Sequence, residues 1–515
     1  MSIDYRPITG VWEITMGCNM RCKHCGSSCE NRLSGELTTD EALKLCDDLA
    51  ELGFKWLTLS GGEPTTRKDW DIIAKRLNDN GVIPNMITNG WLIDDEIAKR
   101  AKAAGINTIA ISLDGLQKTH DFIRREGSYE RIMNALDILV ANEVNCSVIT
   151  TVNKMNLGEL EEMHKILCEK GIYGWQFQLG LPMGNMVKNS ELVAQPHHTD
   201  DVINFAYDAM QKGGVDIQLA DCMGYFNKKE IEVRKKSDSS DEYDWNGCGA
   251  GKYVMGILHN GDIVGCTSIR DRNFIEGNIK ETPILDIWNN PEKFAWNRNL
   301  TKEMLQGTCQ KCQYGNRCHG GCGNTRLTME GTIYGQNRYC SYNLVVKKAE
   351  KQFEGINDID ELMNKARKFA PQNQHQLAEI LLSKVLSLDP ENEEALSLYG
   401  YTSFMLENYK NAVEANEKLL QKDSSNIYAN KGYGLSISRL GMVDEGIKYL
   451  KKAIELSKGT YLDPYYDLAV VYFENGKPAK AMEALEEGFK VSDEFEKSYR
   501  DFYNLLQEQV KEGQA

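Results

Sequence analysis

Three cysteines near the start of the chain have the spacing of a metal-cluster site. Cys18, Cys22 and Cys25 follow a C-x3-C-x2-C pattern directly after the apolar run at residues 11–14. Three thiolates can hold three irons of a cubane [4Fe-4S] cluster, and the missing fourth ligand leaves one iron open to a substrate or cofactor. The alternatives are a redox C-x-x-C or a zinc knuckle in which His24 is the fourth ligand.

Seven more cysteines form a second group further along the chain. They follow the pattern Cys248-x17-Cys266 and then Cys309-x2-Cys312-x5-Cys318-x3-Cys322-x17-Cys340. The chain has 15 cysteines and no secretion signal, and clustered thiols in a reducing compartment usually bind metal or do redox work. The second group therefore predicts further cluster sites, with two structural zinc sites as the alternative.

Composition limits the classes of function. At 515 residues the chain is expected to form two to four domains. Its net charge of −15 repels a phosphate backbone, so nucleic acid is not expected as a partner. No apolar run approaches the roughly 20 residues that a spanning helix needs, so we expect a cytoplasmic protein without a membrane partner.

The N-terminal part alternates short apolar strands with amphipathic helices. Strands are predicted at residues 57–60, 86–88, 108–113, 146–152 and 175–179, and helices at 39–52, 70–79, 94–104, 129–141 and 157–170. Regular alternation predicts a parallel sheet, here an α/β partial barrel of about six units, (β/α)6. Reactive groups in such folds gather at the carboxyl ends of the strands.

Polar motifs occur where these strands end. The candidates are Gly61, Gly62 and Glu63 after the second strand, Asn89 after the third, Ser112 and Asp114 after the fourth, and Thr151 and Asn153 after the fifth. Glycines let the backbone approach a ligand closely, and a carboxylate accepts hydrogen bonds from ammonium or ribose groups. Each motif by itself could be a turn. Their common location, at the carboxyl ends of successive strands, predicts one binding site.

In this order the motifs resemble those of the radical S-adenosylmethionine superfamily over residues 11–186. The resemblance implies that Cys18, Cys22 and Cys25 bind the cluster, with His24 in place of the usual aromatic residue. It further implies that Gly61, Gly62 and Glu63 hold the methionine end of S-adenosylmethionine, that Ser112 and Asp114 hold the ribose, and that Asn153 and its neighbours hold the adenosine.

That resemblance also implies a reaction. The reduced cluster cleaves S-adenosylmethionine to a 5′-deoxyadenosyl radical, which abstracts hydrogen from a substrate. A reducing partner such as flavodoxin or ferredoxin is implied too. No catalytic acid, base or radical-relay residue can be assigned, because the candidates Tyr225, Asp221, Asp262 and Gln178 cannot be ranked from sequence.

The second cysteine group resembles the SPASM domain, an auxiliary-cluster module. By that resemblance Cys309, Cys312, Cys318 and Cys340 ligate an outer auxiliary [4Fe-4S] cluster, and Cys248, Cys266 and Cys322 ligate an inner one. The inner cluster then has an open iron or a further ligand, for which Cys222 is the nearest spare cysteine. Apolar stretches at residues 253–258 and 263–266, on either side of Asn260-Gly261, predict a β-hairpin.

The C-terminal third has a helical repeat. Ala366, Gly400, Gly434 and Ala469 recur about every 34 residues, and so do Ala378, Ala412, Gly446 and Ala481. The pattern resembles about four tetratricopeptide repeats, which form an all-α solenoid with a groove for peptides; an ordinary helical bundle is the alternative. Acidic residues outnumber basic ones here, which predicts a basic or neutral ligand unless the charge lies on a solvated outer face.

Together these patterns predict a domain order and a function. The predicted domains are a radical S-adenosylmethionine barrel at 9–200, a helical linker at 201–240, a SPASM domain at 241–348 and repeats at 356–510. The pairing of barrel and SPASM domain implies a peptide or protein substrate, as in the cross-linking or other maturation of a ribosomal peptide, with the repeats recruiting the substrate. The alternatives are anaerobic sulfatase maturation, although Thr267 stands where those enzymes have an aspartate, and a zinc-stabilised adaptor without catalysis.

Overall fold

The computed structural model describes residues 5–239, 243 and 245–512, which form two compact units. The first unit comprises Met1–Gln310 and Tyr314–Val345, and the second comprises Lys311–Gln313 and Val346–Ala515. The boundary expected between 240 and 241 lies outside the described residues. The other domain limits stay predictions.

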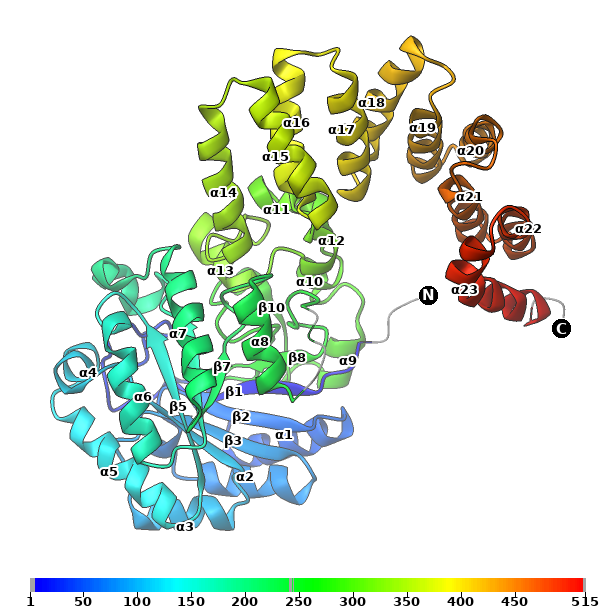
Figure 1. The fold of residues 1–515 in the computed structure, drawn as a ribbon. Coiled ribbons are helices and arrows are strands. Elements are labelled where there is room, and N and C mark those ends of the chain that lie inside the picture. Colours follow the sequence, from blue (N-terminus) through cyan, green and yellow to red (C-terminus); the bar gives the residue numbers. More distant parts are fainter. Residues whose placement is uncertain (1–4, 240–242, 244, 513–515) are drawn as a thin grey trace. The chain divides into compact units, whose positions relative to one another are not determined.

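Seven parallel strands in sequence order form the centre of the first unit (Figure 1). They are β1 (Thr9–Thr15), β2 (Trp56–Gly61), β3 (Ile83–Thr88), β4 (Thr108–Ser112), β5 (Asn145–Val152), β6 (Gly174–Leu179) and β7 (Asp216–Leu219). The connecting helices are α1 (Thr39–Glu51), α2 (Trp70–Asp79), α3 (Asp95–Ala103), α4 (Gln117–Ile123), α5 (Ser128–Ala141), α6 (Leu160–Glu169) and α7 (His198–Lys212). This sequential parallel order confirms the predicted partial barrel.

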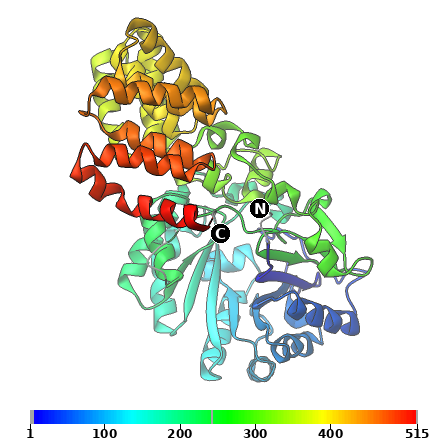
Figure 2. The same ribbon diagram turned by 90° about the vertical axis from the view of Figure 1, so that its right-hand side faces the viewer.

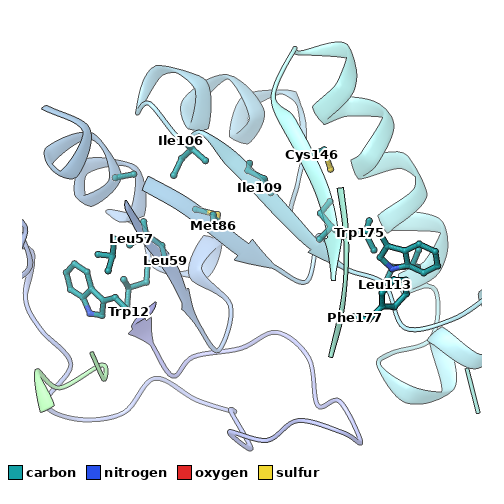
Figure 3. Close-up of a cluster of buried hydrophobic side chains, with 14 of the residues drawn as sticks. Trp12, Leu57, Leu59, Met86, Ile106, Ile109, Leu113, Cys146, Trp175 and Phe177 are labelled. Atoms are coloured by element: carbon teal, nitrogen blue, oxygen red, sulfur yellow. The ribbon is translucent and has the colours of Figure 1, made fainter. Parts of the chain in front are cut away.

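Alternating burial fixes the register of these strands. In β5 the side chains of Cys146, Val148, Thr150 and Val152 are buried, and those between them are less so. Their buried faces join the helices in one apolar core, of which Figure 3 shows side chains from several strands. A one-residue slip would turn this apolar face away from the helices, so the register also determines which side chains reach the strand ends.

The segment expected to be a helical linker also contains a strand. β7 is the last parallel strand, and α8 (Lys228–Ser237) follows it. Only two of its four residues, Ile217 and Leu219, are buried. Such a short pattern carries little strand signal, and pairing with β6 determines its conformation.

The predicted hairpin is present and extends the barrel sheet. β8 (Val254–Ile257) pairs antiparallel with β9 (Asp262–Val264), which pairs with β10 (Ile275–Asn278). β8 also pairs in parallel with β1, so the hairpin between Cys248 and Cys266 joins the barrel strands in one ten-stranded sheet. Short helices follow: α9 (Ile284–Asn289), α10 (Ala295–Arg298), α11 (Gly307–Lys311), α12 (Gly315–Cys318), α13 (Gly323–Glu330) and α14 (Ser341–Glu354).

The second unit is a stack of antiparallel helix pairs, shown from yellow to red in Figure 2. Its helices are α15 (Ile359–Phe369), α16 (His375–Leu388), α17 (Glu393–Met405), α18 (Tyr409–Lys422), α19 (Ile427–Arg439), α20 (Val443–Ser457), α21 (Asp463–Glu474), α22 (Pro478–Phe489) and α23 (Asp493–Glu512). α17 also contacts α19, and α19 contacts α21, so the first helices of successive pairs form one continuous face. This arrangement confirms the predicted solenoid.

In the part of the chain that the structure describes, no helix combines the length and the apolar character needed to cross a membrane.

Small residues in the repeats are predicted to be essential where helices cross. A Cβ on Gly446 of α20 would lie 2.5 Å from the carbonyl oxygen of Gly434 in α19. Gly446→Val should therefore lower the free energy of unfolding by about 1–3 kcal/mol in chemical denaturation. Gly355→Val is the control, because a Cβ there meets no atom within 4 Å; equal losses in both variants would contradict the close crossing.

Candidate functional site

The first three cysteines lie in a loop that begins at the carboxyl end of β1 and closes on itself. The amide of Cys18 donates to the carbonyl oxygen of Glu30 at 2.9 Å. Hydrogen-bond donors face the sulfurs: the Met20 amide lies 3.4 Å from Cys18 Sγ, and Arg124 Nη1 lies 3.9 Å from Cys22 Sγ. Burial raises the pKa of both thiols, and the Met20 amide and the Arg124 charge oppose that shift, which would favour the thiolate form that binds iron.

The Gly-Gly-Glu loop packs against this cysteine loop. The Gly62 amide donates to Thr15 O at 2.7 Å, and the Glu63 amide donates to Gly17 O at 2.8 Å. A Cβ on Gly61 would lie 2.2 Å from Thr15 O, and one on Gly62 would lie 2.3 Å from Gly17 O. The glycines are thus required for the approach of one backbone to another, immediately before Cys18; their predicted contact with the methionine end of a ligand stays a prediction.

Glu63 is fully buried, and its carboxylate accepts hydrogen bonds from neighbouring residues of the protein. Its Oε1 accepts hydrogen bonds from Thr88 Oγ1 at 2.6 Å and from the hydroxyl and amide of Thr65, and its Oε2 accepts from the Asn89 amide at 2.7 Å. Burial raises the pKa of this carboxyl, and the hydrogen bonds act in the opposite direction. Glu63 therefore joins the ends of β2 and β3; its contact with an ammonium group stays a prediction.

Asn89 connects that junction to the cysteine loop. Its Nδ2 donates to Asn19 Oδ1 at 2.7 Å and lies 4.0 Å from Cys18 Sγ. Its Oδ1 accepts from the Trp91 amide. The structure thus brings Asn89, Glu63 and the first cysteine together, as the strand-end argument predicted.

Asp114 is the buried centre of an ion network at the end of β4. Arg124 Nε lies 2.5 Å and His24 Nε2 2.9 Å from its Oδ2, and the Thr151 amide donates to its Oδ1 at 2.7 Å. Burial would raise the pKa of Asp114, but the charges of Arg124 and His24 outweigh burial and hold the pKa well below its usual range. In the structure this carboxylate fixes His24, which lies between Cys22 and Cys25 in the sequence; its expected contact with ribose hydroxyls stays a prediction.

The remaining strand-end candidates differ in exposure. Ser112 is half-buried and pairs with Ile149, while Thr151 Oγ1 accepts from Gln178 Nε2 at 2.9 Å. Asn153 is fully buried, donates to Thr151 O and accepts from the Met155 amide. Its side chain thus shapes the loop after β5, and the predicted ribose and adenosine contacts of these residues stay predictions.

Two of the outer auxiliary cysteines, Cys309 and Cys340, accept hydrogen bonds from the same asparagine. Asn343 donates from Nδ2 to Cys309 Sγ and from its amide to Cys340 Sγ, both at 3.4 Å, and the Asn337 amide donates to Cys309 Sγ at 3.3 Å. Cys318 packs in one buried cluster with Cys340. Hydrogen bonds to sulfur are typical of iron–sulfur sites and tune their potentials. Cys312 is buried and falls in the second compact unit.

The inner auxiliary cysteines also influence one another. Burial raises the pKa of Cys322 most, and the neighbouring thiols of Cys248, Cys222 and Cys266 raise it further. Cys222 Sγ accepts from the Leu179 amide at 3.3 Å, which places it at the end of β6. Tyr225 is fully buried and its hydroxyl accepts from the Cys322 amide at 2.9 Å, so it supports this site from within.

The donor chemistry fits iron–sulfur clusters at these cysteines. Arg326 is fully buried, and its Nε and Nη2 have no hydrogen-bond partner among the described residues, as suits a neighbouring anionic group. Across the described ranges, no three His, Cys, Asp or Glu side chains converge where one metal ion could sit. His24, the fourth ligand of the alternative zinc site, instead pairs with Asp114.

Four features of the site were not predicted. Cys29 hydrogen-bonds Cys25 and lowers its pKa to about 5. Arg270 donates to Glu13 Oε2 at 2.7 Å, and Asn156 Nδ2 donates to Asp114 O at 3.1 Å. Arg124, the fourth, lies beside Cys22; the contacts of Arg124, Arg270 and Asn156 all join residues that are distant in the chain.

Three family profiles match the chain. "Radical SAM superfamily" matches residues 12–167, "Iron-sulfur cluster-binding domain" matches 248–313, and "Tetratricopeptide repeat" matches 462–495. These matches cover the barrel, part of the second cysteine group and the last helical repeats.

Relatives and solved structures agree with these profiles. The AdoMet-dependent heme synthase of Methanosarcina barkeri is 31% identical over 64% of this chain and 95% of its own length. The mycofactocin maturase MftC of Mycobacterium tuberculosis is 28% identical over 61% of this chain and 78% of its own. SuiB of Streptococcus suis bound to S-adenosylmethionine shares the fold with a TM-score of 0.54 and 17% identity over 65% of this chain and 78% of its own.

Removing the central carboxylate should destabilise the barrel strongly. Asp114→Asn leaves the buried Arg124 without its counter-ion, which should cost about 3–5 kcal/mol of unfolding free energy. Asp137→Asn breaks an exposed ion pair with Lys170 and should cost at most about 1 kcal/mol. Urea denaturation followed by tryptophan fluorescence measures both, and similar losses would rule out the buried network as the stronger interaction.

Acid should weaken the fold through His120. Burial, aided by the charge of Arg124, lowers the pKa of His120 to about 3, while the unfolded chain protonates it near its ordinary value of 6.5. The unfolded state therefore binds more protons below pH 6.5, and stability falls by up to about 1.4 kcal/mol per pH unit as pH decreases toward 3. In His120→Gln the unfolding free energy should depend less on pH between pH 7 and 5 than in the wild type. His197 is exposed, so His197→Gln should leave that dependence unchanged. An unchanged pH dependence in His120→Gln would contradict the prediction.

Proposed function

Because this chain belongs to the radical S-adenosylmethionine superfamily, we propose that it abstracts hydrogen from a peptide or protein substrate recruited by its C-terminal repeats. It is an enzyme that combines the radical barrel with a SPASM domain and tetratricopeptide repeats. The zinc-stabilised adaptor alternative is accordingly set aside. The substrate class proposed is a ribosomal peptide that undergoes cross-linking or another side-chain or backbone modification.

The residues at the strand ends have distinct tasks in this proposal. When bound, the cluster and S-adenosylmethionine supply a 5′-deoxyadenosyl radical that abstracts hydrogen. Cys18, Cys22 and Cys25 would hold the cluster, in a loop braced by Gly62 and Asn89. Asp114 and Arg124 would keep His24 fixed between two of these ligands and exclude water from that part of the loop.

The observation that carries the peptide proposal is the continuous face formed by α17, α19 and α21. Two of its tyrosines pair with aromatic rings beside it: the ring centroid of Tyr428 in α19 lies 4.9 Å from that of Tyr461 in a tilted arrangement, and Tyr466 in α21 stacks on Tyr499 of α23 with centroids 4.3 Å apart. Lys431 lies among them, 3.3 Å from both Asp463 and Asp467. Exposed tyrosines beside fixed charges suit an extended polypeptide, which offers both apolar side chains and backbone hydrogen bonds.

A second candidate is a tetrapyrrole substrate. It is favoured by the 31% identity to an AdoMet-dependent heme synthase, of which this chain covers 95%. In that case the barrel would act on an iron–porphyrin precursor and the repeats would bind another protein. Sulfatase maturation stays an alternative within the peptide class, although Thr267 follows Cys266 here.

A point variant on the repeat face tests the peptide proposal. Tyr428 is 62% exposed, and its truncation in Tyr428→Ala should lower kcat/KM for a full-length peptide about tenfold, the effect of losing an aromatic anchor. Release of 5′-deoxyadenosine without peptide should be unchanged. Tyr173→Ala removes a tyrosine that is 64% exposed in the barrel unit and should have no effect on either reaction.

The assay uses short peptides encoded beside this gene, co-expressed under anaerobic conditions and examined by mass spectrometry. Loss of two hydrogens indicates cross-linking or oxidation, and an unchanged mass with altered chirality indicates epimerisation. Conversion of an iron–porphyrin precursor to heme, with every peptide unmodified, would replace the peptide proposal by the tetrapyrrole one.

A further inference from the structure

Arg326 is a buried cation whose side chain is incompletely paired. It lies in α13 and is fully buried, and its Nη1 donates to the carbonyl oxygen of Ile333. Nε and Nη2 have no hydrogen-bond partner, and no carboxylate forms an ion pair with Arg326, within the residues that the structure describes. A guanidinium in this position requires an anionic neighbour, because burying an uncompensated charge costs several kcal/mol.

The guanidinium lies along the glycine-rich run that separates the two auxiliary cysteine sets. A Cβ on Gly320 would lie 3.2 Å from Nε of Arg326, and a Cβ on Gly323 would lie 3.8 Å from its Nη2. These glycines flank Cys322 of the inner set, and Gly320 follows Cys318 of the outer set by two residues. The absence of side chains at both positions leaves room for the guanidinium against the backbone that carries these ligands.

Both sets of thiols act on this cation. Burial lowers the pKa of Arg326, and the thiols of Cys248, Cys309 and Cys322 oppose that shift. Cys309 belongs to the expected outer set, whereas Cys248 and Cys322 belong to the inner one. Together with its position along the run from Gly320 to Gly323, this shows that Arg326 lies close enough for the charges of ligands of both proposed clusters to act on it.

Two other basic side chains occur nearby. Burial lowers the pKa of Lys252, which Cys248 partly offsets, and burial with the charges of Lys252 and Arg326 lowers the pKa of His319. Arginine keeps its proton in such surroundings more firmly than lysine or histidine does. Arg326 is consequently the most persistent positive charge among these three.

We infer that Arg326 is a shared counter-ion of the two auxiliary clusters and raises the reduction potential of both. This inference rests on the clusters assigned under the proposed function. A cluster held by thiolates is anionic, and each electron that it accepts adds negative charge. A fixed cation in a low-dielectric site stabilises the reduced state more than the oxidised one, so its removal makes reduction harder.

The test is an EPR-monitored redox titration of the full-length protein purified anaerobically. Arg326→Met removes the charge and keeps an apolar side chain, and Arg326→Lys keeps the charge. Arg298→Met is the matched control, because Arg298 is another arginine of this region and is partly buried. Its guanidinium packs on Tyr5, Trp288 and Phe294, and no thiol is among the groups that shift its pKa. A Cys18→Ala, Cys22→Ala, Cys25→Ala variant identifies the signals of the auxiliary clusters.

Arg326→Met should shift the reduction equilibrium of the auxiliary signals at least tenfold, about 59 mV more negative for a one-electron couple. Arg326→Lys should shift them less, and Arg298→Met should leave them in place. Loss of iron in Arg326→Met with retention in Arg326→Lys would also support the role of the charge.

Unchanged potentials in an iron-replete Arg326→Met protein would overturn the inference. Equal shifts in Arg298→Met, or loss of iron in both Arg326 variants, would overturn it too, since either result makes the side chain's fit and not its charge the cause. A wild-type protein without auxiliary signals or labile sulfide would instead refute the proposed clusters themselves.

Discussion

The structure depends on the pairing of a buried charge at the carboxyl ends of the parallel strands. Asp114 has no exposed surface, yet it is surrounded by Arg124, His24 and the Thr151 amide. A carboxylate can be buried only where such partners replace water. Because those partners come from the cysteine loop, the loop after α4 and the end of β5, one buried charge holds together three segments to which we assign the cluster and its ligand.

The second cysteine group poses the same problem, because a buried thiolate, like a buried carboxylate, needs hydrogen-bond donors or a cation beside it. Amides of Asn337 and Asn343 donate to its sulfurs, and the guanidinium of Arg326 lies along the glycine-rich run that carries Cys322. Apolar packing alone would leave a polar group such as Arg326 without compensation. Because β8 pairs with β1, the hairpin between Cys248 and Cys266 belongs to the same sheet as the strand that precedes Cys18.

The repeats obey a different rule. Their stability comes from close contacts between neighbouring helices, such as Gly434 against Gly446, and each pair depends mainly on the next. Such a unit can present exposed tyrosines on one face without disturbing a central core. This division fits the proposal that the barrel positions the reactive groups and that the repeats bind the substrate.

Several features followed from the sequence by itself. The alternation of apolar and polar residues predicted the strands and helices of the barrel, and the 34-residue interval predicted the paired helices, because each is a local pattern with a fixed period. Cysteine spacing predicts the cluster sites in the same way, and their ligands stay predictions. β7 was not predicted, because only two of its residues, Ile217 and Leu219, show the alternation of a strand. Its pairing with β6 determines its extended conformation.

Only the tertiary structure decided what the polar candidates do. Gly61 and Gly62 allow close contacts between backbones, and Glu63 and Asp114 are buried and accept hydrogen bonds from several residues of the protein. Arg270 meets Glu13 across 257 residues of chain, and Arg326 lies along the glycine-rich run that carries Cys322. Sequence determines which groups can ionise or donate; burial and long-range packing determine which partners they find, because the energy of a charge depends on its surroundings in three dimensions.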